Sequence, residues 1–383
     1  SAASACSPLD LGERACEVRR TGFATGWEMR RAIALAGALM LMLAGADVHA
    51  QPTTDYLTPR EPRRLALVVG NHDYANFLKL PGSVTDAERM RDILRDKLGF
   101  TVDTITDADT FEGFEAKLVP FANKVQPGDL VVFYFSGHGF AHGAHNYLVP
   151  TKAPKLVRPA DVPRAFVPES AVRALLKEKS PGLIVVFLDA CRTYAGIVSA
   201  SAPPYAPPAS PAVDANGAAH GAAEASEPQT EPAMGLAALA GLSSDMIVGF
   251  AAAPGQPAIG MPAGQPSTYT KALLDTLSQD GWEFGKVRSR INYIVRTGTG
   301  EAQTPYFTDS LITELYLRPT QRLRDEDRAL WVATMAEGDV AKVQEYYATN
   351  RVGPYAQNAL RWIADHPNGV RPTFSAVSPL QPE

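Results

Sequence analysis

Two short apolar runs constrain the fold of this chain most strongly. They read LVVFYF over residues 130–135 and GLIVVFL over residues 182–188. Runs of this length, rich in valine and without polar alternation, are typical of strands that are buried on both faces. The chain is therefore expected to build its core around a sheet that is covered on both sides.

Segments with helical spacing separate these runs from other short strands. Further strands are expected at residues 65–69, 101–104 and 246–253. Helices are expected at residues 86–97, 111–123, 168–179, 267–278 and 284–296. Strands that alternate with helices need crossover connections, which favour parallel pairing. We therefore predict an α/β fold, with a mostly parallel sheet and helices on both faces.

Composition divides the chain into further parts. Residues 199–241 are rich in Ala, Pro, Ser and Gly, which indicates a flexible insertion and not a domain. The folded domain is predicted over residues 65–319, after a polar leader at residues 51–64. Residues 320–383 contain two segments with helical spacing, and we predict that they form a small helical extension.

The N-terminal region has the three parts of a secretory signal. Residues 29–50 combine two arginines after Met29, an apolar run over residues 32–46 and small residues that end at Ala50. We expect cleavage after Ala50, so the protein is predicted to be exported, either periplasmic or secreted. An uncleaved membrane anchor is the alternative, because short apolar runs sometimes remain as anchors. Residues 1–28 do not resemble an export signal and are interpreted as upstream sequence.

Charge and cysteine content limit the classes of function that this chain can have. The chain has 36 Lys and Arg against 41 Asp and Glu, and its net charge of -5 argues against a general nucleic-acid binder. Cys6 and Cys16 precede the expected cleavage site, so Cys191 is the one cysteine left. An unpaired thiol in an exported protein has either a chemical role or the common role of a small apolar filler.

Both apolar runs end in residues that are able to carry chemistry. The first is followed by SGHG at residues 136–139, and the second by DACR at residues 189–192. In an open α/β sheet, ligands bind outside the carboxyl ends of the strands. We predict that His138 accepts the thiol proton of Cys191 and that the resulting thiolate attacks a carbonyl carbon. The amides of Gly139 and Cys191 are candidate donors to the oxyanion.

Asp189 has a different predicted role. If the strand continues to its end, Asp189 shares a face with Cys191, and Ser136 shares a face with His138. A buried carboxylate beside the nucleophile raises the pKa of the thiol, which opposes catalysis. Asp189 is better suited to the base of a pocket for a cationic side chain, and this predicts selectivity for lysine or arginine.

These residues resemble a known family. FYFSGHG, with LDACR following so that Cys191 lies 53 positions after His138, is similar to the histidine and cysteine blocks of the caspase-like cysteine peptidases. The resemblance is closest to metacaspases and their bacterial relatives, the orthocaspases, and extends over residues 65–317. It implies the caspase-like (caspase-hemoglobinase) fold, a three-layer sandwich with helices on both faces of the sheet.

The resemblance also implies roles for single residues. His138 is the general base and Cys191 the nucleophile. Metacaspases cleave after arginine or lysine, and their primary pocket corresponds here to Asp86, Ser136 and Asp189, with Ser83 where many relatives have cysteine. The acidic residue that calcium-activated members carry seven positions after the nucleophile is Val198 here, so we expect calcium independence. Residues 193–270 contain no lysine or arginine, so self-processing of this linker is not expected.

Other interpretations of the same residues stay open. Asp86 is also explained as an acidic residue in the first turn of a helix, and Ser83 as the cap of that helix. His138, His142 and His145 have a spacing that suggests zinc, but structural zinc sites need four ligands. No metal is therefore predicted, and residues 140–145 are expected to be a loop.

Together these features predict a cysteine endopeptidase of caspase-like fold. Its expected partners are protein or peptide substrates with arginine or lysine before the scissile bond. No cofactor, nucleic acid or stable membrane partner is expected. The alternative is a caspase-like scaffold that binds peptides or partner proteins with little turnover.

Overall fold

The computed structural model describes residues 54–192, 196–197, 236–239, 242–243, 245–256, 258–309 and 311–367, with only the backbone for Thr54, Leu156, Cys191, Arg192, Gly196 and Ile197. The predicted signal at residues 29–50, the segment before it and most of the predicted insertion at residues 199–241 lie outside the described residues. Within the ranges described, no helix has the length and apolar character that a membrane span requires.

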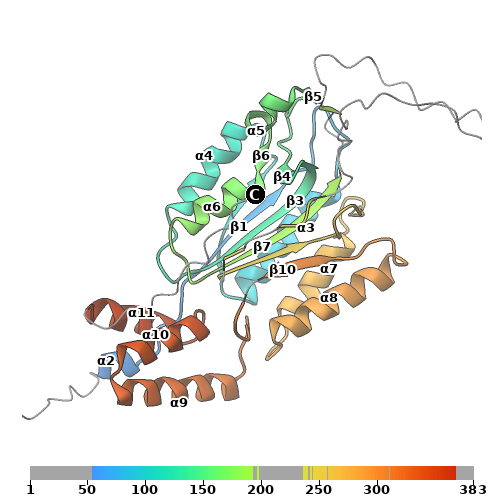
Figure 1. The fold of residues 1–383 in the computed structure, drawn as a ribbon. Coiled ribbons are helices and arrows are strands. Elements are labelled where there is room, and N and C mark those ends of the chain that lie inside the picture. Colours follow the sequence, from blue (N-terminus) through green and yellow to red (C-terminus); the bar gives the residue numbers. More distant parts are fainter. Residues whose placement is uncertain are drawn as a thin grey trace, which may run out of the picture. The chain divides into compact units, whose positions relative to one another are not determined.

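One mostly parallel sheet organises the described part of the chain (Figure 1). Its main path runs β10-β9-β7-β3-β1-β2, and β4 and β6 extend it beside β3. The strands are β1 (Arg64–Gly70), β2 (Thr101–Thr106), β3 (Leu130–His142), β4 (His145–Leu148), β6 (Val167–Pro168), β7 (Leu183–Arg192), β9 (Met246–Phe250) and β10 (Tyr306–Asp309). Neighbours from β2 to β9 pair in parallel, whereas β10 and β4 pair antiparallel. The predicted α/β class with a mostly parallel sheet is confirmed.

Helices cover both faces of this sheet (Figure 1). One face packs against α3 (Gly82–Asp96), α7 (Thr268–Leu277) and α8 (Phe284–Gly298), and the other against α4 (Phe111–Ala122) and α6 (Glu169–Lys177). Smaller elements are β5 (Leu156–Val157), which pairs with β8 (Gly196–Ile197), η1 (Pro159–Asp161) and α5 (Val162–Ala165).

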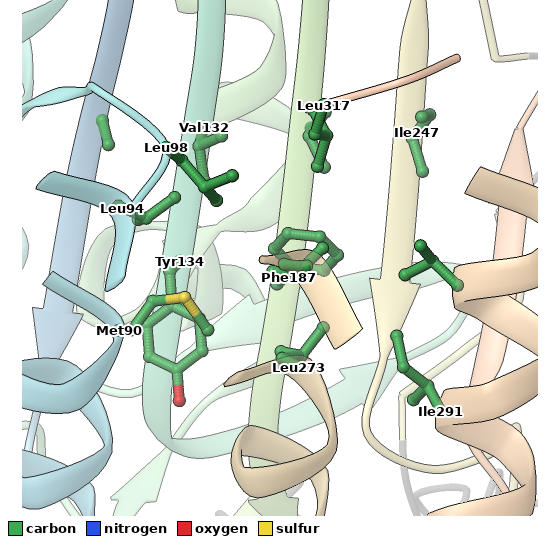
Figure 2. Packing of buried hydrophobic residues seen from close by; sticks show 14 of the residues in the cluster. Met90, Leu94, Leu98, Val132, Tyr134, Phe187, Ile247, Leu273, Ile291 and Leu317 are labelled. Carbon is green, nitrogen blue, oxygen red and sulfur yellow. The ribbon is translucent and has the colours of Figure 1, made fainter. Parts of the chain in front are cut away.

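The two apolar runs supply both halves of the core. Alternate side chains of a strand point to opposite faces, so Tyr134 and Phe187 pack with Met90, Leu273 and Ile291 of the helices on one face (Figure 2). The intervening residues of the same strands belong to the cluster under α4 and α6. The prediction that these runs are strands buried on both faces is confirmed.

The predicted boundaries of β3 and α3 are wrong. β3 does not end at residue 135 but continues to His142, because β4 pairs with it and Gly143, at a φ of 58°, makes the turn between them. The predicted loop at residues 140–145 is therefore a β-hairpin. Helix α3 begins at Gly82 and not at residue 86, so its first turn lies upstream of Asp86.

The C-terminal helices form a core of their own. Helices α9 (Gln321–Glu337), α10 (Val340–Thr349) and α11 (Ala356–Asp365) pack around Trp331. The short helix α2 (Thr54–Leu57), in the predicted leader, joins them because Trp331 Nε1 donates a hydrogen bond to the carbonyl of Tyr56 at 2.8 Å. Asn358 Nδ2 donates to the same carbonyl at 2.9 Å.

Candidate active site

The register of β3 and β7 brings the two sequence motifs together. These strands are parallel neighbours, with Ser136 opposite Asp189 and His138 opposite Cys191. Adjacent strands lie about 4.8 Å apart, so the backbones of the two predicted catalytic residues are immediate neighbours. The side chain of Cys191 lies outside the part of the chain that the structure describes. The condition for the predicted shared faces is met, since β3 reaches His142 and β7 reaches Arg192.

His138 is held by a backbone carbonyl. Its side chain is buried, and its Nε2 lies 2.7 Å from the carbonyl oxygen of Leu78, in the loop between β1 and α3. A carbonyl oxygen only accepts hydrogen bonds, so Nε2 carries the proton when the ring is neutral. The lone pair is then on Nδ1, which makes Nδ1 the nitrogen that is able to accept a proton. Sequence reasoning missed Leu78 because this contact comes from a main-chain atom and leaves no side-chain pattern.

Tyr74 fixes the strand at His138. Its hydroxyl accepts a hydrogen bond from the backbone N–H of His138 at 2.8 Å and donates to the carbonyl of Val149 at 3.2 Å. The Tyr74 ring also packs against the imidazole, with centroids 4.4 Å apart. A side chain at Gly137 would place its Cβ 2.6 Å from the Tyr74 hydroxyl, so this arrangement requires glycine there.

Close packing also explains why residue 139 is a glycine. A Cβ at this position would lie 2.9 Å from the Cβ of Ala190 on β7. Glycine therefore allows β3 and β7 to approach closely beside the catalytic pair. The role of the Gly139 and Cys191 amides as oxyanion donors stays a prediction.

A pocket of about 380 Å³ is lined by Gly137, which precedes His138, and by Leu78, whose carbonyl contacts the His138 ring. The loop around Leu78 and the start of α3 form one side, and residues 258–262, which follow β9, form another. Its polar lining comes from Lys79, Ser83, Asp86, Ser136, Asp189 and Ser267. The ammonium of Lys79 is paired with Asp73, which is not a lining residue. The structure thus brings all four residues of the predicted primary pocket to one cavity.

Two buried carboxylates dominate this pocket. Asp86 accepts hydrogen bonds from the backbone N–H of Ser267 at 2.7 Å and from the hydroxyl of Ser136 at 3.0 Å. Asp189 accepts hydrogen bonds from the hydroxyls of Thr270, at 2.8 Å, and Ser267. Ser267 therefore donates to both carboxylates, one through its backbone and one through its side chain.

Burial makes both carboxylates hard to ionise. Loss of water contact, followed by repulsion from Asp189, raises the pKa of Asp86 to about 8, although its bonds from Ser267 and Ser136 act in the opposite direction. Burial likewise raises the pKa of Asp189, against the bonds from Ser267 and Thr270. At neutral pH the pair therefore retains a proton, and a positively charged group in the pocket would favour its release.

The alternative roles of Asp86, as a first-turn acid, and of Ser83, as a helix cap, are wrong. Because the helix starts at Gly82, Asp86 lies beyond its first turn and faces the pocket. The N-cap position is Pro81 and has no side-chain cap, so Ser83 does not cap this helix. Ser83 is instead buried in the first turn and lines the pocket.

Sequence reasoning missed Ser267 and Thr270. Ser267 is the N-cap of α7, where its hydroxyl accepts a hydrogen bond from the backbone N–H of Thr270 at 2.9 Å. A serine at the start of a predicted helix is a recognisable capping signal. Its placement on Asp189 was not predictable in this way, because it depends on how the chain returns to the sheet after the insertion.

The other two histidines of the predicted cluster, His142 and His145, do not line this pocket. His142 and His145 face each other across the β3–β4 hairpin as a register pair. Among the residues whose placement is described, no group of three or more His, Cys, Asp or Glu side chains could hold a metal ion.

The fold and the site define an α/β domain with a histidine and a cysteine paired in register on neighbouring parallel strands. The family model of the caspase domain matches residues 63–316, which is more than half of the chain. The chain therefore belongs to the caspase domain family, a family of cysteine peptidases.

Two relatives are similar to part of this chain. The human protein called mucosa-associated lymphoid tissue lymphoma translocation protein 1 is 29% identical over 148 residues, which cover 39% of this chain and 17% of the relative. Its mouse homolog is 28% identical over 134 residues, which cover 35% of this chain and 15% of the relative. The aligned region thus spans less than a fifth of either relative.

Proposed function

We propose that this protein is a cysteine endopeptidase that hydrolyses peptide bonds after arginine or lysine. The observation that supports it best is the pair of buried carboxylates, Asp86 and Asp189, in the pocket beside His138. Two acids in a low-dielectric pocket strongly favour a cation between them. An apolar or acidic substrate side chain would leave both groups without a counter-ion.

In the proposed reaction, Nδ1 of His138 accepts the thiol proton of Cys191. The thiolate attacks the scissile carbonyl carbon, and the amides of Gly139 and Cys191 stabilise the resulting oxyanion. The imidazolium then gives its proton to the leaving amine as the carbon–nitrogen bond breaks. Water, activated by His138, hydrolyses the thioester and restores the thiol.

The pocket chemistry favours arginine over lysine. A guanidinium has five N–H donors in a planar fork, so one side chain is able to donate to both Asp86 and Asp189. The lysine ammonium has three donors on a single nitrogen and reaches two separated carboxylates less well. We expect both residues to be accepted, with arginine preferred.

We also propose that the enzyme is independent of calcium, is not self-processed and is exported. The residue at the position of the calcium-site acid is Val198, so activity is expected without calcium. The linker over residues 193–270 lacks lysine and arginine, so the enzyme is expected to remain one chain. The signal-like residues 29–50 support export to the periplasm or the medium.

Peptides with a fluorogenic leaving group after arginine, lysine or aspartate test this proposal. The wild type should cleave the arginine peptide best, and Cys191→Ala should abolish cleavage. Preference for the aspartate peptide would refute the pocket assignment. Absence of thiol-dependent cleavage of all three peptides would favour the alternative, a scaffold that binds partners with little turnover.

A further inference from the structure

A larger pocket, of about 860 Å³, lies at the amino-terminal end of the sheet. It is lined by the first residues of β1 and β2, whereas the candidate active site lies at the carboxyl ends of β3 and β7. Arg324 of α9 and residues 317–319 complete it. This pocket therefore shares no residue with the proposed peptidase site.

The lining of this pocket is strongly basic. Among the described residues that line it, Glu61 and Asp280 are acidic, and six are basic, namely Arg63, Arg64, Lys97, Lys124, Arg318 and Arg324. The whole chain has a net charge of -5, so a basic pocket is a local feature and not a consequence of composition.

Ion pairs neutralise part of this charge and hold the side chains in place. Four of the six basic residues have a carboxylate partner, in the pairs Arg63–Asp129, Lys124–Asp103, Arg318–Asp280 and Arg324–Glu61. For Arg64 and Lys97, no ion pair is found with any other described residue. Arg64 and Lys97 are therefore the basic residues of the pocket with no carboxylate in direct contact among the described residues, and Glu61 acts on Arg64 only through its charge at longer range.

The surroundings of Arg64 give the stronger argument for an anion site. Its Nη1 donates to the carbonyls of Leu98, at 3.0 Å, and Leu317, at 2.9 Å, and burial lowers the pKa of its guanidinium. Two bonds to carbonyl oxygens satisfy part of the five N–H donors and supply no counter-charge. The charge of Glu61 opposes this effect without contacting the guanidinium. A largely buried cation with no carboxylate in direct contact is costly, so the site favours an anion.

We propose that this pocket binds a small polyanion with at least two phosphate groups, with Arg64 and Lys97 as its main ligands. Arginine recognises phosphate through paired hydrogen bonds, and the volume exceeds that of a single phosphate ion. The bound anion lies between β1 and Arg324 of α9, so it joins the peptidase domain to the C-terminal helices.

Binding of inorganic tripolyphosphate to the full chain tests the proposal, by calorimetry and by the shift in melting temperature. We expect binding that weakens with added salt, and weaker binding of orthophosphate. Lys97→Glu should weaken tripolyphosphate binding about tenfold, from the loss of one charge-assisted contact. Lys117→Glu is the matched control, because Lys117 is an exposed lysine of α4 outside the pocket.

Arg64→Lys provides a second test that keeps the charge. This variant should also weaken binding, because lysine lacks the planar fork, and its circular dichroism shows whether the fold is intact. Vesicles of phosphatidylglycerol are tested in parallel to distinguish a lipid headgroup from a soluble phosphate. Binding to vesicles without binding to tripolyphosphate, no binding to either, or equal weakening by Lys117→Glu would each overturn the proposal.

Discussion

The raised pKa of Asp86 makes binding of a cation dependent on pH. Burial and the neighbouring Asp189 raise the pKa of Asp86 to about 8, so about a tenth of this carboxyl is ionised at pH 7 and about nine tenths at pH 9. A cation that requires the ionised pair should therefore bind about tenfold more tightly at pH 9 than at pH 7. At pH 7, binding should release about one proton from the pocket.

Benzamidine is a suitable probe, because its amidinium stays positively charged over this range. The Cys191→Ala variant is used as the background, since it removes the thiol, which titrates in the same range. Calorimetry in two buffers with different heats of ionisation gives the number of protons released. Asp86→Asn, on the same background, should reduce this proton release and the change in affinity between about pH 7 and pH 9, with any remainder due to Asp189, whose pKa burial also raises.

The direction in which cation affinity changes with pH is the critical test. A carboxyl with a raised pKa is neutral below that pKa, so affinity for a cation must rise with pH. An affinity that falls or stays constant between about pH 7 and pH 9 would refute the reasoning. The same slope in Asp86→Asn would also refute it, because another group would then be responsible.

Four further predictions follow from particular residues. His138→Ala should abolish cleavage of the arginine peptide, whereas replacing both His142 and His145 by alanine should leave most of the activity. Gly137→Ala should reduce kcat strongly without loss of the fold seen by circular dichroism, since its Cβ would lie 2.6 Å from the Tyr74 hydroxyl. Leu273→Ala should lower the free energy of unfolding by about 2–5 kcal/mol, because it removes a fully buried side chain, and denaturant titration measures this. The melting temperature should fall as pH rises from about 5 to about 8, because the raised carboxyl pKa opposes ionisation in the folded state, and fluorimetry should show a smaller fall in Asp86→Asn.

The sequence predicted the architecture well because its signals were strong and local. The apolar runs of β3 and β7 have no polar residue that would place one face in water, so they had to be central strands. Their parallel pairing then places Ser136 beside Asp189 and His138 beside Cys191. Two motifs far apart in the sequence became neighbours through topology alone.

The errors in the sequence prediction have a physical cause at strand and helix ends. The glycines of SGHG suggested the end of β3, but they permit close packing against Tyr74 and Ala190 within a continuing strand. Helix α3 starts early because Ser83 and its neighbours are buried against the pocket, and tertiary contact outweighs the weak helix propensity of glycine and serine. Such contacts leave no local pattern.

The N-terminus of α7 explains how the pocket holds two carboxylates at all. Both acids accept hydrogen bonds from the first residues of this helix, Asp86 from the amide of Ser267 and Asp189 from the hydroxyls of Ser267 and Thr270. The positive end of the helix dipole favours negative charge there, which opposes the cost of burial. Helix α7 follows the insertion in the sequence, so the pocket is complete only when the chain returns to the sheet and places Ser267 between the two acids. The specificity of the proposed peptidase therefore depends on a residue 76 positions after Cys191, and Ser267→Ala should impair arginine binding more than it impairs the fold.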